Sequence, residues 1–248
     1  MTVVAHVSDL HIDGGPRSRA RAAAVMGYLD RLAGPIDAVV VTGDLTDHGL
    51  PDEYAHLRTI LPSRYPVLTV PGNHDTRAAY REVLLGEAPE QADGPVNRVA
   101  YAGGAAFLLV DSTIPGEGRG ALADETLEWL EATLTRAAGQ PAFVCFHHPP
   151  VILHSPYVDE IRQFGVERLA AAIERHPGVV AVLCGHAHTG AATTFAGRPL
   201  LAAPGVVSTI EVPWVGADLI DEEHPPAVAF HVLDGDRRVT THFRAVRL

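Results

Sequence analysis

Residues 38–47 read Ala-Val-Val-Val-Thr-Gly-Asp-Leu-Thr-Asp, so an apolar run is followed at once by a glycine and two acidic side chains. A short continuous run rich in β-branched residues is typical of a strand that is buried on both faces of a parallel sheet. Open α/β sheets collect ligands where such strands end. The segment therefore predicts a buried strand over 38–42 that brings Asp44 and Asp47 to the edge of a sheet.

The same arrangement recurs along the chain, which predicts a mostly parallel sheet covered by helices. Further apolar runs of strand length lie at 3–7, 67–70, 105–110, 142–146 and 179–183. Between most of these runs, apolar residues at helical spacing predict helices over 17–32, 51–61, 124–138 and 159–175.

After Gly190 the pattern changes to short strands joined by turns. These strands are predicted at 193–195, 198–202, 206–210, 227–233 and 238–243, with a long surface loop over 212–226. We expect them to form a second sheet packed on the first. The predicted fold class is α/β, a four-layer α/β/β/α sandwich of two mixed sheets flanked by helices, with residues 1–248 as a single domain.

Composition narrows the classes of function. The chain has 248 residues, 47% of them hydrophobic, and 30 acidic against 19 basic side chains give a formal net charge of -11. A nucleic-acid partner is disfavoured, because a large footprint on a polyanion requires a basic face. No apolar run approaches the roughly 20 residues of a membrane span, and a motif begins as early as Asp9, so we expect a cytoplasmic protein without a membrane partner. Cys145 and Cys184 are expected to be reduced core residues.

Five short polar segments come shortly after predicted strands, and they combine carboxylates, one amide and several imidazoles. They are Asp9-Leu-His11, Gly43-Asp44-Leu-Thr-Asp47, Gly72-Asn73-His74-Asp75, His147-His148-Pro149 and Gly185-His186-Ala-His188. In an extended chain, residues i and i+2 project from the same face, so the Asp-x-His and His-x-His pairs can each reach one site. Mixed oxygen and nitrogen ligands suit two divalent transition-metal ions (Mn, Fe, Zn or Co) better than magnesium or calcium.

In this order, the five segments resemble the calcineurin-like metallophosphoesterase superfamily, and more narrowly its bacterial class III cyclic nucleotide phosphodiesterases and glycerophosphodiesterases. The resemblance runs from residue 9 to residue 188. It implies that one metal ion is bound by Asp9, His11 and His188, that the other is bound by Asn73, His147 and His186, and that Asp44 bridges the two. His148 would then pack or hydrogen-bond beside the ligands.

The resemblance also implies a catalytic role for His74, which would hold the substrate phosphate or protonate the leaving oxygen. Asp47 would orient His74, or alternatively would cap the helix that begins at Pro51. Arg77 is a candidate contact to a phosphate oxygen, with an ordinary solvated residue in a helical turn as the alternative. Further candidates for the substrate pocket are the loop 13–19 and His154 with Tyr157, and for His154 an exposed or structural histidine is the alternative.

The implied activity is a dinuclear metal-dependent phosphodiesterase that hydrolyses small diesters, either cyclic nucleotides (3′,5′ or 2′,3′) or glycerophosphodiesters. Two metal ions lower the pKa of a bridging water, and the hydroxide would attack phosphorus. A phosphomonoesterase and a nucleotide pyrophosphatase are alternatives on the same site, and a non-catalytic scaffold is a more distant one because the ligand set is complete. A homodimer is implied by resemblance only.

Overall fold

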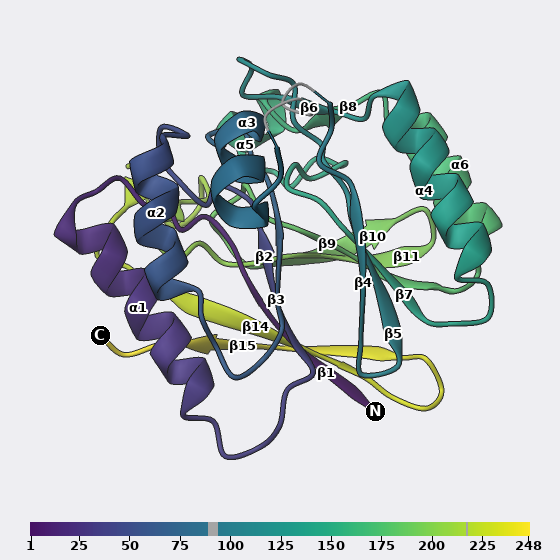
Figure 1. The fold of residues 1–248 in the computed structure, drawn as a ribbon, viewed down its shortest axis with the longest axis horizontal. Helices are drawn as coiled ribbons and strands as arrows, with labels where there is room; N and C mark the ends of the chain where they lie inside the picture. Colours follow the sequence, from purple (N-terminus) through teal and green to yellow (C-terminus); the bar gives the residue numbers. More distant parts are fainter. Residues whose placement is uncertain (89–93, 217) are drawn as a thin grey trace.

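Two β-sheets packed face to face form the centre of the molecule, and helices cover both outer faces (Figure 1). This arrangement is seen in a computed structural model that describes residues 1–88, 94–216 and 218–248. Strands of the first sheet lie in the order β15-β14-β1-β2-β3, and those of the second in the order β10-β11-β9-β7-β5-β4. The predicted four-layer α/β/β/α sandwich is confirmed.

The first sheet is made of β1 (Thr2–Val7), β2 (Ala38–Thr42), β3 (Val67–Val70), β14 (Ala227–Leu233) and β15 (Val239–Ala245). The second is made of β4 (Arg98–Ala102), β5 (Ala105–Leu109), β7 (Ala142–Cys145), β9 (Val179–Cys184), β10 (Ala191–Phe195) and β11 (Arg198–Ala202). Both sheets are mixed, because β1, β2 and β3 are parallel, as are β5, β7, β9 and β11, while β14, β15, β4 and β10 join them antiparallel.

Helices α1 (Pro16–Asp30) and α2 (Pro51–Ile60) cover the first sheet, and α4 (Asp124–Arg136) and α6 (Glu167–Arg175) cover the second (Figure 1). The shorter elements are α3 (Arg77–Ala79), which leads into the π-helical turn η1 (Tyr80–Leu85), α5 (Pro156–Glu160), the strand pair β6 (Gly120–Ala121) and β8 (Gln163–Phe164), and the pair β12 (Thr209–Ile210) and β13 (Ile220–Asp221). Within the described parts of the chain, none of the helices combines the length and apolar character that a membrane crossing requires.

The three interfaces between the four layers explain the continuous apolar strands. Val39 and Val41 of β2 pack in one apolar cluster with α1 and α2, whereas Val40 belongs to the cluster between the two sheets. In that inner cluster, Phe107 and Phe143 stack with ring centroids 5.1 Å apart. Alternate residues of a strand point to opposite faces, so a strand with apolar layers on both sides has to be apolar throughout.

Three features of the fold differ from the prediction. The C-terminal strands do not form the second sheet by themselves, because β14 pairs antiparallel with β1 and extends the first sheet, while β11 pairs with β9 and extends the second. The helix predicted over 159–175 is interrupted: Gly165 has a φ of +63°, which a helix does not accept, and β8 separates α5 from α6. The predicted strand 206–210 is reduced to β12, and β13 lies in the loop predicted over 212–226, whose residue 217 is outside the described residues.

Candidate metal centre

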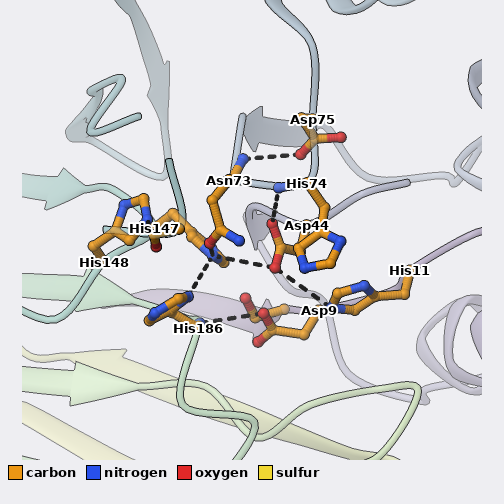
Figure 2. Close-up of polar contacts among 12 residues, drawn as sticks. Asp9, His11, Asp44, Asn73, His74, Asp75, His147, His148 and His186 are labelled. Carbon is orange, nitrogen blue, oxygen red and sulfur yellow. Dashed lines mark hydrogen bonds and ion pairs between the residues drawn. The ribbon is translucent and has the colours of Figure 1, made fainter. Parts of the chain in front are cut away.

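The five polar segments meet at one edge of the two sheets, because each follows the carboxyl end of β1, β2, β3, β7 or β9. Figure 2 shows side chains from all five segments, among them Asp9, Asp44, Asn73, His147 and His186, gathered around a common centre at Asp44. Cys145 and Cys184 lie at the ends of β7 and β9 as free, buried thiols, as predicted.

One group of ligand atoms comes from Asp9, His11, Asp44 and His188, which lie within 4.8 Å of one another. His11 Nε2 is 3.2 Å from His188 Nε2, and His188 Nε2 is 3.6 Å from Asp9 Oδ1. Asp9 and Asp44 are buried at 0% and 2% exposure. The structure thus brings together the side chains of the first predicted ligand set with Asp44, and their binding of a metal ion stays a prediction.

A second group lies on the other side of Asp44. His147 Nε2 is 3.1 Å from Asn73 Oδ1 and 3.1 Å from His186 Nδ1. Asp44 Oδ2 lies 3.4 Å from His147 Nε2 and also 3.4 Å from His11 Nε2 (Figure 2). A single carboxylate oxygen therefore stands between the two groups.

The backbone at the predicted metal ligands is strained. Five of them have φ between 42° and 67°, in the left-handed region that residues other than glycine rarely adopt. They are Asp9, His11, Asp44, His186 and His188. The predicted extended geometry of the Asp-x-His and His-x-His pairs is therefore wrong, because the strands have already ended and the chain is turning. Such strain costs about 1–3 kcal/mol per residue and is typical of functional sites.

Two glycines allow the segments to approach closely. Gly43 has a φ of +92°, and a Cβ there would meet His147 Nδ1 at 2.4 Å. A Cβ on Gly72 would lie 2.2 Å from Asp44 Oδ1 and 2.3 Å from the Asp44 backbone nitrogen. Real Cβ contacts are essentially never shorter than 3.0 Å, so both positions require glycine.

Hydrogen bonds to the predicted ligands, on the side away from the centre, set which ring nitrogen faces it. His147 Nδ1 donates to the Thr42 carbonyl oxygen at 2.7 Å, and His11 Nδ1 donates to Asp47 Oδ1 at 2.8 Å. His188 Nδ1 is 3.0 Å from Ser208 Oγ. Since these partners hold the Nδ1 sides, Nε2 of each ring is left to present a lone pair to the centre, which is the form of histidine that binds metal.

The electrostatics of the centre call for positive charge. Burial by itself would raise the pKa of Asp44, but His147 and His11 outweigh it and hold that pKa well below its usual value. Burial would lower the pKa of His147, yet the Asp44 carboxylate raises it to about 9. Asp9 Oδ2 is buried without a hydrogen-bond partner in the described structure. An unpaired buried carboxylate oxygen is costly, so the donor set fits divalent cations.

His74 and Asp47 lie at the rim of the centre. His74 Nδ1 donates to the Asp47 backbone oxygen at 2.8 Å, while the Asp47 carboxylate is 3.7 Å away and accepts from His11 instead. Asp47 thus holds His74 through its main chain and His11 through its side chain. The capping alternative is not seen, because Leu50 occupies the N-cap of α2.

Arg77 and His154 lie elsewhere. Arg77 Nε is 2.8 Å from the buried carboxylate of Asp111, and its NH2 group donates to the Thr113 carbonyl oxygen at 2.9 Å. This inward ion pair differs from both the phosphate contact and the solvated residue considered for Arg77. His154 is exposed, and neither residue is among the described residues that line the cleft over the centre.

Sequence reasoning gave no role to Asp75, which connects two of the segments. Its carboxylate accepts from the backbone nitrogens of Gly72, Leu45 and Thr46 and from the Tyr54 hydroxyl. The signal was its place in the Gly-Asn-His-Asp segment. His148 behaves as expected beside the ligands, with Nδ1 2.8 Å from Ser112 Oγ and Nε2 3.2 Å from the Gly118 oxygen.

A cleft of about 370 Å³ opens over the centre. It is lined by His74 and by five of the predicted metal ligands, which are His11, Asp44, Asn73, His186 and His188. Asp13, which precedes α1, and Arg17, in its first turn, also line it. The volume falls in the roughly 300–1,000 Å³ range of small-molecule sites. A small substrate can therefore reach both groups of ligand atoms.

Comparison with known proteins is consistent with this geometry. The family model for calcineurin-like phosphoesterases matches residues 2–190. The glycerophosphodiester phosphodiesterase GpdQ of Enterobacter lignolyticus is 35% identical over 96% of this chain and 89% of its own length. A cAMP/cGMP dual specificity phosphodiesterase of Mycobacterium tuberculosis is 32% identical over 84% of this chain and 68% of its own length.

Among solved structures, a dimetal phosphatase from Danio rerio superposes with a TM-score of 0.73 at 16% identity, covering 99% of this chain and 96% of the other. A purple acid phosphatase from yellow lupin superposes with a TM-score of 0.67 at 16% identity, covering 99% of this chain and 51% of the other. At such identities the similarity shows the fold alone. Because the family model spans more than half of the sequence, the chain belongs to the calcineurin-like phosphoesterase family.

Proposed function

We propose that the protein is a dinuclear metal-dependent phosphodiesterase that hydrolyses small diesters, such as cyclic nucleotides or glycerophosphodiesters. The observation that carries the proposal is the position of Asp44 Oδ2, 3.4 Å from His11 Nε2 in one group of ligand atoms and 3.4 Å from His147 Nε2 in the other. Relatives named as glycerophosphodiester and cyclic nucleotide phosphodiesterases support the choice of diesters.

The residues that would hold the metals divide around Asp44. Asp9, His11 and His188 would hold one ion, Asn73, His147 and His186 the other, and Asp44 both. The mixed nitrogen and oxygen donors favour Mn, Fe, Zn or Co. When bound, two such ions supply positive charge to phosphate oxygens and lower the pKa of a water toward neutrality. The positive charge of two divalent ions would exceed the negative charge of the Asp9 and Asp44 carboxylates, so the centre would attract an anionic ester.

In this proposal His74 would donate a proton to the leaving oxygen. Its Nδ1 is engaged by the Asp47 carbonyl, which leaves Nε2 for a group bound in the cleft. The Asp47 carboxylate, 3.7 Å from Nδ1, complements the positive charge of a protonated ring. A positioned general acid of this kind contributes about 10²–10⁴-fold to the rate.

A phosphomonoesterase and a nucleotide pyrophosphatase could use the same centre, so substrate comparison is the test. The manganese-loaded protein should cleave bis(p-nitrophenyl) phosphate faster than p-nitrophenyl phosphate, and Asp44→Ala should abolish the activity. Faster cleavage of the monoester would move the proposal to a phosphatase. Activity that persists in Asp44→Ala would overturn the metal centre.

The native metals and the homodimer remain predictions. Metal analysis of protein purified without chelators should identify two equivalents drawn from Mn, Fe, Zn or Co. Light scattering during gel filtration should give twice the mass of the 26.4 kDa chain.

A further inference from the structure

We propose that the cleft selects diesters carrying an uncharged aromatic group, and that the side chains of Tyr157 and Ile220 contact this group. The inference rests on the proposed function, because it concerns which ester occupies the same centre. Its basis is the outer wall of the cleft, which none of the five polar segments forms.

That wall is apolar and open. Tyr157 from α5, Ile161, Ile210 of β12 and Ile220 of β13 line the cleft beside His188. Ile210 is 5% exposed, but Tyr157 and Ile220 are 49% and 52% exposed. Large apolar side chains left open at the mouth of a ligand cleft gain free energy when a ligand covers them.

The wall is fixed to the metal ligands. Ile210 packs with Val158 of α5 and with Ala187, the residue between the ligands His186 and His188. Thr209 Oγ1 donates to the His188 carbonyl oxygen at 3.0 Å, and Thr189 Oγ1 donates to the Ile210 carbonyl oxygen at 2.7 Å. These contacts hold Ile210 and β12 against the segment that carries His186 and His188.

Helix α1 fastens the far end of the wall. Arg17 donates from its NH2 group to the Val207 carbonyl oxygen at 2.8 Å and also to the Glu222 carbonyl oxygen, next to β13. One helical turn later, Arg21 Nε donates to the Val206 carbonyl oxygen at 2.8 Å. These hydrogen bonds reach the backbone just before β12 and just after β13. The strand pair that carries Ile220 is therefore anchored to α1.

The charges around the cleft determine what kind of organic group fits. Besides the metal ligands, Asp13, Asp47 and Glu222 line it against the single guanidinium of Arg17. A second phosphate or a carboxylate on the substrate would be repelled.

An aromatic ring matches the wall better than glycerol does. Its apolar faces can cover Tyr157 and Ile220, and stacked or edge-on contact with the tyrosine adds to the area that is removed from water. Glycerol carries a hydroxyl on every carbon that is not esterified and would leave the wall in water. The cleft therefore favours the aromatic ester.

The test compares two diesters across variants of the manganese-loaded protein. Bis(p-nitrophenyl) phosphate is the aromatic probe, and diglyceryl phosphate, followed by released glycerol, is the non-aromatic one. Ile220→Ala and Tyr157→Ala should each lower kcat/KM for the aromatic diester about tenfold, mainly through KM, which is typical of losing one apolar contact in a pocket. Both should leave the glycerol diester within about twofold.

Leu219→Ala is the matched control, because Leu219 is also exposed (47%) and adjoins Ile220, but is not among the described residues lining the cleft. It should change neither substrate, and metal content and Tm should be the same in all variants. If the Tyr157 and Ile220 variants lose kcat/KM equally on both diesters, or lose it on neither, the inference is wrong. The proposed function still holds in that case, provided that the wild-type protein cleaves the diesters. A wild-type protein that cleaves neither diester would overturn the proposed function and this inference with it.

Discussion

Replacing Gly72 by alanine should disable the centre through a steric contact whose size follows from the structure. The new Cβ would lie 2.2 Å from Asp44 Oδ1 and 2.3 Å from the Asp44 backbone nitrogen, where at least 3.0 Å is needed. Rotating the Asp44 side chain relieves only the first contact. The backbone near Gly72 or Asp44 therefore has to move by about 0.7 Å, the difference between 2.3 Å for the backbone nitrogen and 3.0 Å.

A displacement of about 1 Å in a catalytic arrangement costs on the order of 10²-fold in rate, and overpacking of this kind destabilises a fold by about 1–3 kcal/mol. We therefore expect Gly72→Ala to lose about 100-fold in kcat/KM on bis(p-nitrophenyl) phosphate, with metal bound more weakly. Gly235→Ala is the matched control, because a Cβ there meets nothing within 4 Å. If Gly72→Ala keeps the kinetics and the metal content of the wild type, the contact between residue 72 and Asp44 does not require glycine.

Three further outcomes are expected. His74→Ala should retain both metals while turnover slows by about 10²–10⁴-fold, and loss of metal from this variant would contradict a role outside the ligand set. Asp47→Asn should weaken metal binding about 10–100-fold in chelator competition, because Asp47 holds His11 by its side chain; unchanged affinity would exclude that role. Burial lowers the pKa of His231 to about 3 and, with His231 beside it, holds the pKa of His6 well below its usual value. Because both rings stay neutral when folded but bind protons below about pH 6.5 when unfolded, stability should be full above that pH and fall as pH drops, by about 1.4 kcal/mol per unit for each ring. In urea titrations at several pH values, the free energy of unfolding of His231→Gln should fall less steeply with decreasing pH than that of the wild type. An equal slope for both proteins would contradict the view that the buried neutral histidines cause the loss.

The sequence was most informative where burial dictates residue type. Strands β2 and β3 were predicted with their observed bounds, since apolar layers on both faces leave a run such as Ala38–Thr42 little freedom. The sheet membership of the C-terminal strands was not predictable in the same way. The alternation within β14 shows which face is buried, but its pairing with β1 is a long-range choice that carries no local signal.

At the centre, residue types could be predicted and backbone geometry could not. Asp9 and His11 were expected to project from an extended chain, yet both adopt positive φ because the turn after β1 carries them. Asp47 was expected to orient His74 by its side chain, whereas the carboxylate is used by His11 and the carbonyl by His74. Spacing along the chain indicates which side chains gather, and the turn geometry decides which atoms meet.

The outer wall of the cleft was predicted only in part. Arg17 and Tyr157 were among the candidates for the substrate pocket, whereas Ile220, about 200 residues from Arg17 in sequence, belongs to no recognisable motif. Ile220 and Arg17 meet because α1 holds the backbone that flanks β12 and β13. Such contacts depend on the completed fold, so specificity is less readable from sequence than the metal ligands are.

Anomalous scattering from crystals of the manganese-loaded protein would locate the two proposed metal ions. We expect two peaks about 3.5–4 Å apart, one beside Asp9, His11 and His188 and the other beside Asn73, His147 and His186, with Asp44 contacting both. A single peak, or two peaks that do not share Asp44, would contradict this proposal.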